Sequence, residues 1–308
     1  MKYRRLGSTQ MQVSVIGVGT WQFGGEWGKD FQQGEVEAIL KTAADLGVNL
    51  IDTAECYGDH LAEQLIGRAI KGQRDRWVIA TKFGHRFNRV LQRDNVYEPK
   101  EVRRQLEDSL RALQTDFIDL YLFHSGTDAM FDTEGLWSML QDQQRQGRIR
   151  HLGISVAKSY SGAHQIDDAS GVGAQVLEVV YNRLHRKHET HTFETCLKQD
   201  LGVMARVPLA SGFLTGRYTK DTHFEGTDVR SAWMKESERL DMLEEAERIR
   251  KEEVPPDVPM AHWALAWALQ HPAVTCVIPG CKNREQARSN AQAADLDLVR
   301  PDHPQAVS

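Results

Sequence analysis

The feature that most constrains this chain is a regular alternation of short apolar runs with longer segments of helical period. It begins near Val13 and continues to the C-terminal end. Such alternation is typical of repeated strand–helix units around a parallel sheet. Eight strands are expected, at residues 13–17, 49–52, 78–81, 118–123, 149–154, 176–180, 202–206 and 275–278.

The segments between these strands have the pattern of amphipathic helices. In the segment 99–113, apolar residues recur at three- and four-residue spacing while charged residues occupy the other positions. We therefore predict an α/β fold, a (β/α)8 TIM barrel, formed as a single domain over residues 1–308. Residues 3–6 and 11–13 flank Gly7-Ser8-Thr9 and predict an N-terminal β-hairpin that caps the barrel bottom. Two long stretches, 83–98 and 211–231, are expected to be irregular loops.

The charge balance argues for small-molecule chemistry. The 38 Lys and Arg residues are offset by 43 Asp and Glu, and no long run of one sign suggests a nucleic-acid partner. The N-terminus lacks the apolar run of a signal peptide, and no stretch approaches the ~20 apolar residues of a membrane span. We expect a cytoplasmic protein without nucleic-acid or membrane partners, whose four cysteines are reduced thiols.

Charged and aromatic residues stand at the ends of three predicted strands. Asp52 ends the second strand, Lys82 the third and His124 the fourth, and Tyr57 follows shortly after the second. A (β/α)8 barrel forms its active site at the C-terminal ends of its strands. These four residues are therefore the candidate catalytic group.

Carbonyl reduction is a reaction that would need residues of these types. The developing alkoxide needs a proton, which Tyr57 could donate if the Lys82 ammonium lowered its pKa. Asp52 would pair with Lys82, and His124 would orient the carbonyl oxygen. The residues alone leave two other interpretations open: a plain ion pair beside a core histidine, and a hydrolase or isomerase using Asp52, Glu55 and His124 without a cofactor.

The tetrad, in this order and at these strand positions, resembles that of the aldo-keto reductase superfamily. Gly17-Val18-Gly19-Thr20-Trp21 resembles the family's first-strand motif, and residues 208–216 resemble its cofactor loop. Ile278-Pro279-Gly280, with Asn290, is similar to its last nucleotide-binding segment. The resemblance implies an NADP(H)-dependent reductase of aldehydes, ketones or sugar-like carbonyls. The alternative is a non-catalytic barrel that binds nicotinamide nucleotide as a regulatory or redox-sensing protein.

No Gly-x-Gly-x-x-Gly element opens a helix, which argues against a Rossmann site. The segment 280–286 instead leads from the last strand into a helix, where backbone amides suit an anion. Lys282 and Arg284 could clamp a 2′-phosphate there, so we expect NADP rather than NAD. The predicted cofactor contacts are Gly19, Thr20, Trp21, Asp52, Ser155, Glu178, Arg206, Pro208, Leu209, Ser211, Gly212, Leu214, Gly216, Arg217, Gly280, Lys282, Arg284, Gln286 and Asn290.

Three positions depart from the commonest family pattern around the nicotinamide. Val156 follows Ser155 where an Asn is usual, Glu178 replaces a Gln, and Arg206 stands where an aromatic ring often stacks. We hypothesise that Arg206 covers the nicotinamide ring while Glu178 balances its charge, since a guanidinium stacks on planar rings. Reduced cofactor should then bind more tightly than oxidised.

The substrate contacts are expected to be Trp21, Trp27, Tyr57 and His124. Three histidines, His185, His188 and His191, recur every third residue, but interleaved basic residues would repel a cation. We expect no metal there or elsewhere in the chain.

Overall fold

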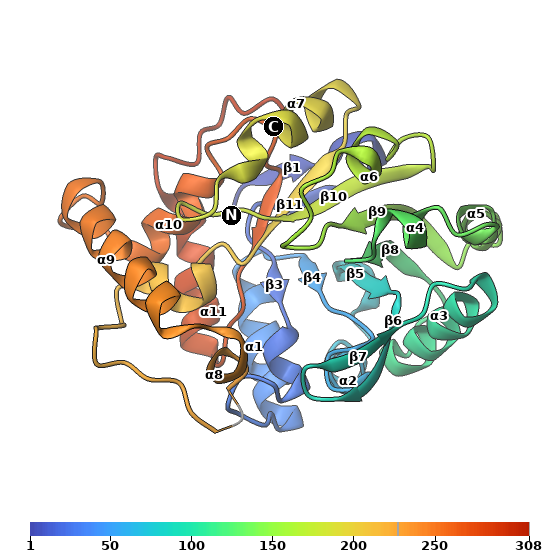
Figure 1. Cartoon of the computed structure of the whole chain (residues 1–308), viewed down its shortest axis with the longest axis horizontal. Coiled ribbons are helices and arrows are strands. Elements are labelled where there is room, and N and C mark those ends of the chain that lie inside the picture. The colour runs from blue at the N-terminus through green and yellow to red at the C-terminus, as the bar shows by residue number, and fades with distance from the viewer. Residues whose placement is uncertain (227, 308) are drawn as a thin grey trace.

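The computed structural model describes residues 1–226 and 228–307, and eight parallel strands form its central sheet (Figure 1). Isolated bridges pair Ile16 with Val277 and Gly19 with Gly280, so the first and last strands meet and the sheet closes into a barrel. This confirms the predicted (β/α)8 fold. The strands, in spatial order, are β3 (Val18–Gly19), β4 (Leu50–Asp52), β5 (Val78–Phe83), β8 (Ile118–His124), β9 (Ile149–Ser155), β10 (Ala174–Val180), β11 (Gly202–Arg206) and β12 (Cys276–Ile278).

The first barrel strand was predicted wrongly. It was expected at 13–17, but Val13 lies in the N-terminal hairpin, where it pairs with Arg4, and β3 begins only at Val18. One apolar run serves both elements, so its hydrophobicity does not show where the hairpin ends. The hairpin consists of β1 (Tyr3–Arg5) and β2 (Gln12–Ser14), as expected in outline. A Cβ on Gly7 would lie 2.0 Å from the Gly202 nitrogen, so the hairpin packs directly against the start of β11.

The helices follow the strands as the periodicity predicts. In α3, Val102, Leu106, Leu110 and Leu113 are buried, and Pro99 occupies its first turn, where a missing N–H costs nothing. The helices are α1 (Gln33–Asp45), α2 (Leu61–Ala69), α3 (Pro99–Leu113), α4 (Asp128–Phe131), α5 (Leu136–Arg145), α6 (His164–Asp167), α7 (His191–Lys198), α8 (Arg230–Trp233), α9 (Glu236–Glu252), α10 (Met260–Ala268) and α11 (Arg284–Gln292).

The stretch 83–98 is not an irregular loop, as the sequence suggested. It contains the antiparallel hairpin of β6 (His85–Arg89) and β7 (Gln92–Asn95). The strands are rich in polar residues and lack the alternation of apolar residues that marks a half-buried strand. Arg93 anchors the hairpin to the barrel rim through a 2.8 Å contact with Glu26. The second stretch begins with the 3-10 helix Ala210–Thr215 and is otherwise mostly irregular up to α8, and its residue 227 lies outside the described residues.

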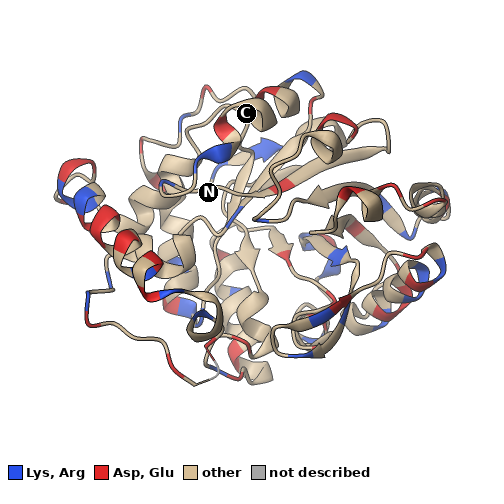
Figure 2. Ribbon diagram, in the orientation of Figure 1, with Lys and Arg blue, Asp and Glu red and all other residues tan. Residues whose placement is uncertain are grey.

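The barrel interior is filled by apolar side chains from successive strands, including Leu50, Leu120, Leu122, Val176 and Met204. Figure 2 shows acidic and basic residues interspersed along helices α3 and α9. Within residues 1–226 and 228–307, no helix combines the length and the apolar character needed to cross a membrane. The four cysteines are free thiols, as expected, and all are buried.

Candidate active site

The structure brings the four predicted catalytic residues together at the C-terminal ends of β4, β5 and β8. Lys82 is fully buried, and its Nζ donates to Asp52 Oδ1 at 2.5 Å and to the Thr53 carbonyl oxygen at 2.8 Å. The same Nζ lies 5.4 Å from the centre of the Tyr57 ring. The rings of Tyr57 and His124 meet edge to face, with their centres 6.4 Å apart.

A second carboxylate, Glu178 on β10, also faces the lysine. Its Oε2 lies 3.4 Å from Lys82 Nζ, and its Oε1 accepts a hydrogen bond of 3.0 Å from the Ser155 hydroxyl. Burial raises the pKa of Asp52, and the neighbouring Glu178 charge raises it further. Burial opposes the charge on Lys82, but the two carboxylates outweigh it and raise the lysine pKa, so the ammonium form is retained.

The expected fall in the Tyr57 pKa is wrong. Burial of the phenol raises its pKa well above 10, and the charges of Asp52 and Glu178 raise it as well. Lys82 acts in the expected direction but does not offset these effects. The sequence predicted Asp52 and Tyr57 beside Lys82, but it did not show that a second carboxylate, Glu178, faces the lysine or that the phenol is buried.

His124 is a neutral imidazole in this environment. Burial lowers its pKa well below 6.5, and the nearby His85 and Lys82 act in the same direction. Its backbone carbonyl accepts a 2.6 Å hydrogen bond from the Tyr97 hydroxyl, which fixes the end of β8. A neutral ring can offer one N–H and one lone pair to its neighbours.

Beside these residues lies a cavity of about 490 Å³. Most predicted cofactor and substrate contacts line it: Gly19, Thr20, Trp21, Trp27, Asp52, Tyr57, Glu178, Arg206, Pro208, Leu209, Ser211, Gly212, Arg217, Gly280, Lys282, Gln286 and Asn290. Ser155, Leu214, Gly216, Arg284 and His124 are not part of its lining. Ser155 and Leu214 are buried behind it, and Ser155 reaches it only through Glu178.

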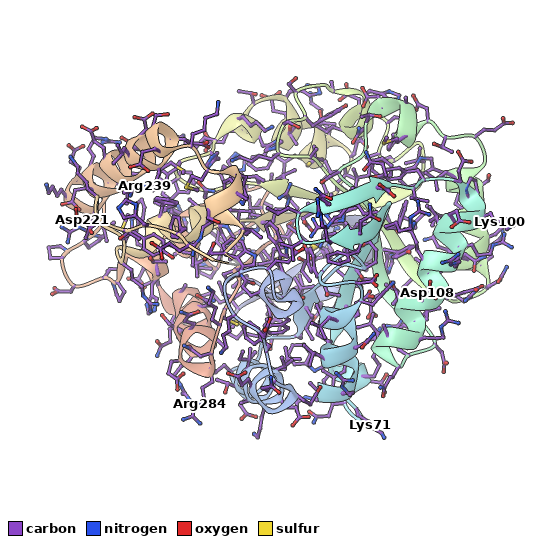
Figure 3. All side chains as sticks on the ribbon, turned by 60° about the horizontal axis from the view of Figure 1, so that its bottom comes forward. Lys71, Lys100, Asp108, Asp221, Arg239 and Arg284 are labelled. Atoms are coloured by element: carbon purple, nitrogen blue, oxygen red, sulfur yellow. The ribbon has the colours of Figure 1, made fainter. Side chains whose placement is uncertain are left out.

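At one end of the cavity, Lys282 and Gln286 lie where β12 leads into α11. Lys282 Nζ donates to the Trp27 carbonyl oxygen at 2.6 Å, and the Lys282 amide donates to Gln286 Oε1 at 2.8 Å. Arg284 is exposed and pairs with its neighbour Glu285 at 2.9 Å, and in Figure 3 its side chain lies at the outer edge of the molecule. Of the two predicted phosphate-clamping residues, only Lys282 therefore lies against the cavity.

Two loops meet over this end, and one of them supplies residues that the sequence did not reveal. Arg230 is buried, pairs with both oxygens of Asp228, and donates to the Ser211 carbonyl oxygen at 2.8 Å. Asp228 in turn bridges to Trp27. From the sequence, an arginine in a long polar stretch is expected to be exposed to solvent. Only the structure identifies Arg230 as part of the cavity wall.

Arg206, at the end of β11, faces the cavity near Glu178. Its Nη2 donates to the Val156 carbonyl oxygen at 2.9 Å, and its Nε lies 3.6 Å from Glu178 Oε1. Arg206 Nε and the Oε1 atom of Gln22 are buried and have no hydrogen-bond partner among the residues described. Both residues line the cavity, but these two atoms are themselves shielded from solvent.

The aromatic side chains form one wall beside Tyr57. Trp21 stacks against Tyr57 with the ring centres 6.1 Å apart, and Trp27 meets Trp21 edge to face at 5.1 Å. The Trp21 indole N–H donates to Glu26, the carboxylate that also holds Arg93 of the β6–β7 hairpin. The hairpin is thus tied to the wall of the cavity.

The site thus combines a closed parallel barrel, a buried lysine–carboxylate cluster and a tyrosine that lines a cavity. The model of the Aldo/keto reductase family matches residues 15–306, and the chain belongs to this family. It is 30% identical to the aldo-keto reductase YhdN of Bacillus subtilis, over 98% of this chain and 91% of the relative. It is 28% identical to an NADH-specific methylglyoxal reductase of Escherichia coli, over 98% and 96%. The holo form of aldo-keto reductase AKR11C1 from Bacillus halodurans superposes with a TM-score of 0.80 and 26% identity, covering 100% of this chain and 98% of that one.

Proposed function

We propose that this protein reduces aldehydes, ketones or sugar-like carbonyls with NADP(H), and that Tyr57 donates the proton. The observation that carries the proposal is the position of Tyr57, which lines the cavity while the Lys82 ammonium lies 5.4 Å from its ring centre. The family is one of oxidoreductases that use a nicotinamide cofactor. The carbonyl class and the NADP preference are our inferences from the residues.

The residues around the cavity fit such a cofactor. Arg206 and Gln22 both line the cavity and carry side-chain groups that can hydrogen-bond a polar ligand. A Cβ on Gly19 would lie 2.6 Å from the Ile278 carbonyl oxygen, so the backbone here is packed too closely for any larger residue. When bound, the cofactor supplies the hydride.

The chain's own residues supply the proton and the orientation. Tyr57 carries its proton throughout the neutral pH range because its pKa is raised by burial. The neutral His124 beside it can hydrogen-bond the carbonyl oxygen and direct it towards the Tyr57 hydroxyl. As the carbonyl oxygen gains charge, the phenol proton passes to it, and the nearby Lys82 ammonium stabilises the phenolate that remains.

Lys282 is the feature that supports NADP over NAD. It is the cation at the helix entrance that lines the cavity, as Arg217 and Arg230 also do. Replacing Lys282 by Ala should weaken NADPH binding by about 10- to 150-fold, the effect of one hydrogen bond to a charged group. NADH affinity should change little. The Arg284→Ala variant serves as the matched control, since an exposed pair is worth at most about 1 kcal/mol.

The decisive experiment combines a fluorescence titration with NADPH and NADH and a screen of carbonyl substrates. Replacing Tyr57 by Phe should lower turnover by about 10²- to 10⁴-fold and leave cofactor affinity unchanged. Tight nucleotide binding without turnover on any carbonyl would favour a regulatory barrel instead. If neither nucleotide binds, the reductase proposal is refuted.

A further inference from the structure

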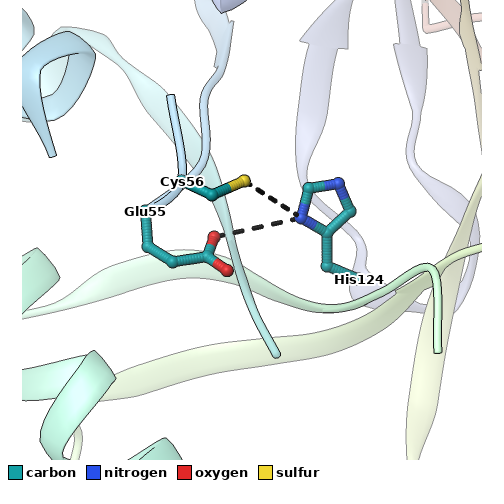
Figure 4. A group of neighbouring side chains, drawn as sticks. All are labelled: Glu55, Cys56 and His124. Atoms are coloured by element: carbon teal, nitrogen blue, oxygen red, sulfur yellow. Dashed lines mark hydrogen bonds and ion pairs between the residues drawn. The ribbon is translucent and has the colours of Figure 1, made fainter. Parts of the chain in front are cut away.

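Three potential metal ligands come together immediately behind Tyr57. Glu55 and Cys56 precede it in the loop after β4, and His124 ends β8 (Figure 4). His124 Nδ1 lies 3.8 Å from Cys56 Sγ and 3.9 Å from Glu55 Oε2, and the three ligand atoms all lie within 4.8 Å of one another.

One atom of this cluster, a carboxylate oxygen of Glu55, is poorly satisfied by the rest of the protein. Glu55 Oε1 accepts a hydrogen bond from the His85 amide at 3.0 Å, but Oε2 is buried and has no hydrogen-bond partner in the described part of the chain. The Glu55 side chain is only 2% exposed, so solvent does not compensate. Cys56 is fully buried, and its sulfur lies within hydrogen-bond distance of His124 Nδ1, at 3.8 Å. A buried carboxylate oxygen without a partner is costly and marks a place where a cation can bind.

We propose that Glu55, Cys56 and His124 form a binding site for a thiophilic divalent cation of the zinc type. Thiolate, imidazole and carboxylate are the ligands that zinc takes in proteins, at about 2.0 to 2.3 Å. With tetrahedral angles, these bond lengths separate sulfur from nitrogen by roughly 3.6 Å and nitrogen from oxygen by roughly 3.4 Å. The observed separations of 3.8 and 3.9 Å therefore need to close by a few tenths of an ångström, and the sulfur–oxygen separation, which lies within 4.8 Å, by up to about 1 Å. The fourth position is left to water, as in zinc sites with three protein ligands.

The surrounding charges permit this site. Lys82 and Arg93 are the cations that act on Cys56. Each is paired with its own carboxylates: Lys82 with Asp52 and Glu178, and Arg93 with Glu26. The bound cation would meet two negative ligands. On binding, Cys56 loses its thiol proton to solvent, the neutral His124 offers the Nδ1 lone pair, and no electron is transferred.

Occupation of this site would draw His124 towards Cys56 and place a cation next to Tyr57. The His124 side chain is 12% exposed, more than the 2% of Glu55. If His124 orients the carbonyl oxygen, the cation inhibits carbonyl reduction. This consequence rests on the proposed function, whereas metal binding itself does not.

The test is a titration of the chelator-treated full-length protein with Cd²⁺, followed by the ultraviolet charge-transfer band of the Cd²⁺–thiolate bond. We expect saturation near one equivalent and loss of the band in Cys56→Ala. Cys196→Ser, which removes another buried thiol far from the site, is the matched control and should keep the band. Glu55→Gln keeps the acceptor for the His85 amide and removes the charge, and it should weaken binding more than about 100-fold. The far-ultraviolet circular dichroism spectrum checks that each variant is folded.

Retention of the band in Cys56→Ala would overturn the site, as would full affinity in both Glu55→Gln and His124→Asn, because the thiol would then act alone. In the activity assay, Zn²⁺ should inhibit the wild type. The Glu55→Gln variant should keep the rate that it has without Zn²⁺, and Mg²⁺ should inhibit neither protein. If the protein reduces no carbonyl, the proposed function fails, but the Cd²⁺ titration still decides the metal site.

Discussion

Four charged side chains, two of each sign, surround the end of the cavity where we place the nicotinamide: Asp52, Glu178, Lys82 and Arg206. Glu178→Gln removes one negative charge with little change of shape, because the Ser155 hydroxyl can still donate to the amide oxygen. Arg206→Gln removes one positive charge from the same group. Oxidised nicotinamide is a cation and reduced nicotinamide is neutral, so the two variants should shift cofactor selectivity in opposite directions.

The size of the shift follows from the distances. Glu178 lies 3.4 Å from Lys82 Nζ and 3.6 Å from Arg206 Nε. Unit charges at these separations interact by about 5 kcal/mol at an effective dielectric constant of about 20, and at about 7 Å by half as much. Water in the cavity weakens this further, so we expect about 1 to 2 kcal/mol, or a 5- to 30-fold change in the ratio of the two dissociation constants.

The assay is a fluorescence titration with reduced cofactor and a competition titration with oxidised cofactor. The wild type should prefer the reduced form, Glu178→Gln should increase that preference, and Arg206→Gln should decrease it. The double variant restores the charge balance and should return close to the wild-type ratio, which makes it the internal control. A shift of both single variants in the same direction, or of neither, would refute the proposed position of Arg206 over the nicotinamide.

Three further predictions concern packing and pH. Gly24→Ala should lower the free energy of unfolding, measured in urea, by about 1 to 3 kcal/mol and should also lower turnover. The reason is that its Cβ would lie 2.6 Å from the Tyr57 carbonyl carbon. Gly34→Ala is the control and should not destabilise the fold, because there is open space around Gly34. Burial, with the charge of Arg4, lowers the pKa of His303 to about 4. The neutral imidazole therefore stabilises the fold above pH 6.5, and this stabilisation is lost as the pH falls towards 4. The stabilisation lost is at most about 3 kcal/mol. His303→Gln should therefore reduce the difference between the unfolding free energies at about pH 7.5 and about pH 4.5. An unchanged difference would contradict this assignment to His303. Alcohol oxidation needs an ionised Tyr57, so its rate should rise about tenfold per pH unit around neutrality, in contrast to carbonyl reduction measured in parallel.

The sequence predicted the barrel and its rim because both depend on local pattern. Apolar runs mark strands, and the residue that follows each run lies at the rim of the barrel whatever the loops do. Asp52, Lys82 and His124 were found in this way. Tyr57 was found because it is close in sequence to the end of β4.

What the sequence did not predict depends on contacts between distant segments. Arg230 becomes part of the cavity only because its loop returns to Ser211 and Trp27. The β6–β7 hairpin is held by Arg93 and Glu26, a contact that no local pattern signals. The cluster of Glu55, Cys56 and His124 joins the loop after β4 to the end of β8, more than sixty residues away in the sequence.

The raised pKa of Tyr57 changes the role that Lys82 is expected to have. An alkoxide is about as basic as hydroxide, whose conjugate acid, water, has a pKa of about 15.7, so a phenol need not be unusually acidic to protonate it. The phenol must instead hold its proton until the hydride arrives, and burial ensures this. Lys82 limits the rise in pKa and stabilises the phenolate afterwards, and Asp52 and Glu178 keep the lysine charged. Because two carboxylates rather than one surround this lysine, the site favours the protonated tyrosine that the proposed reduction uses.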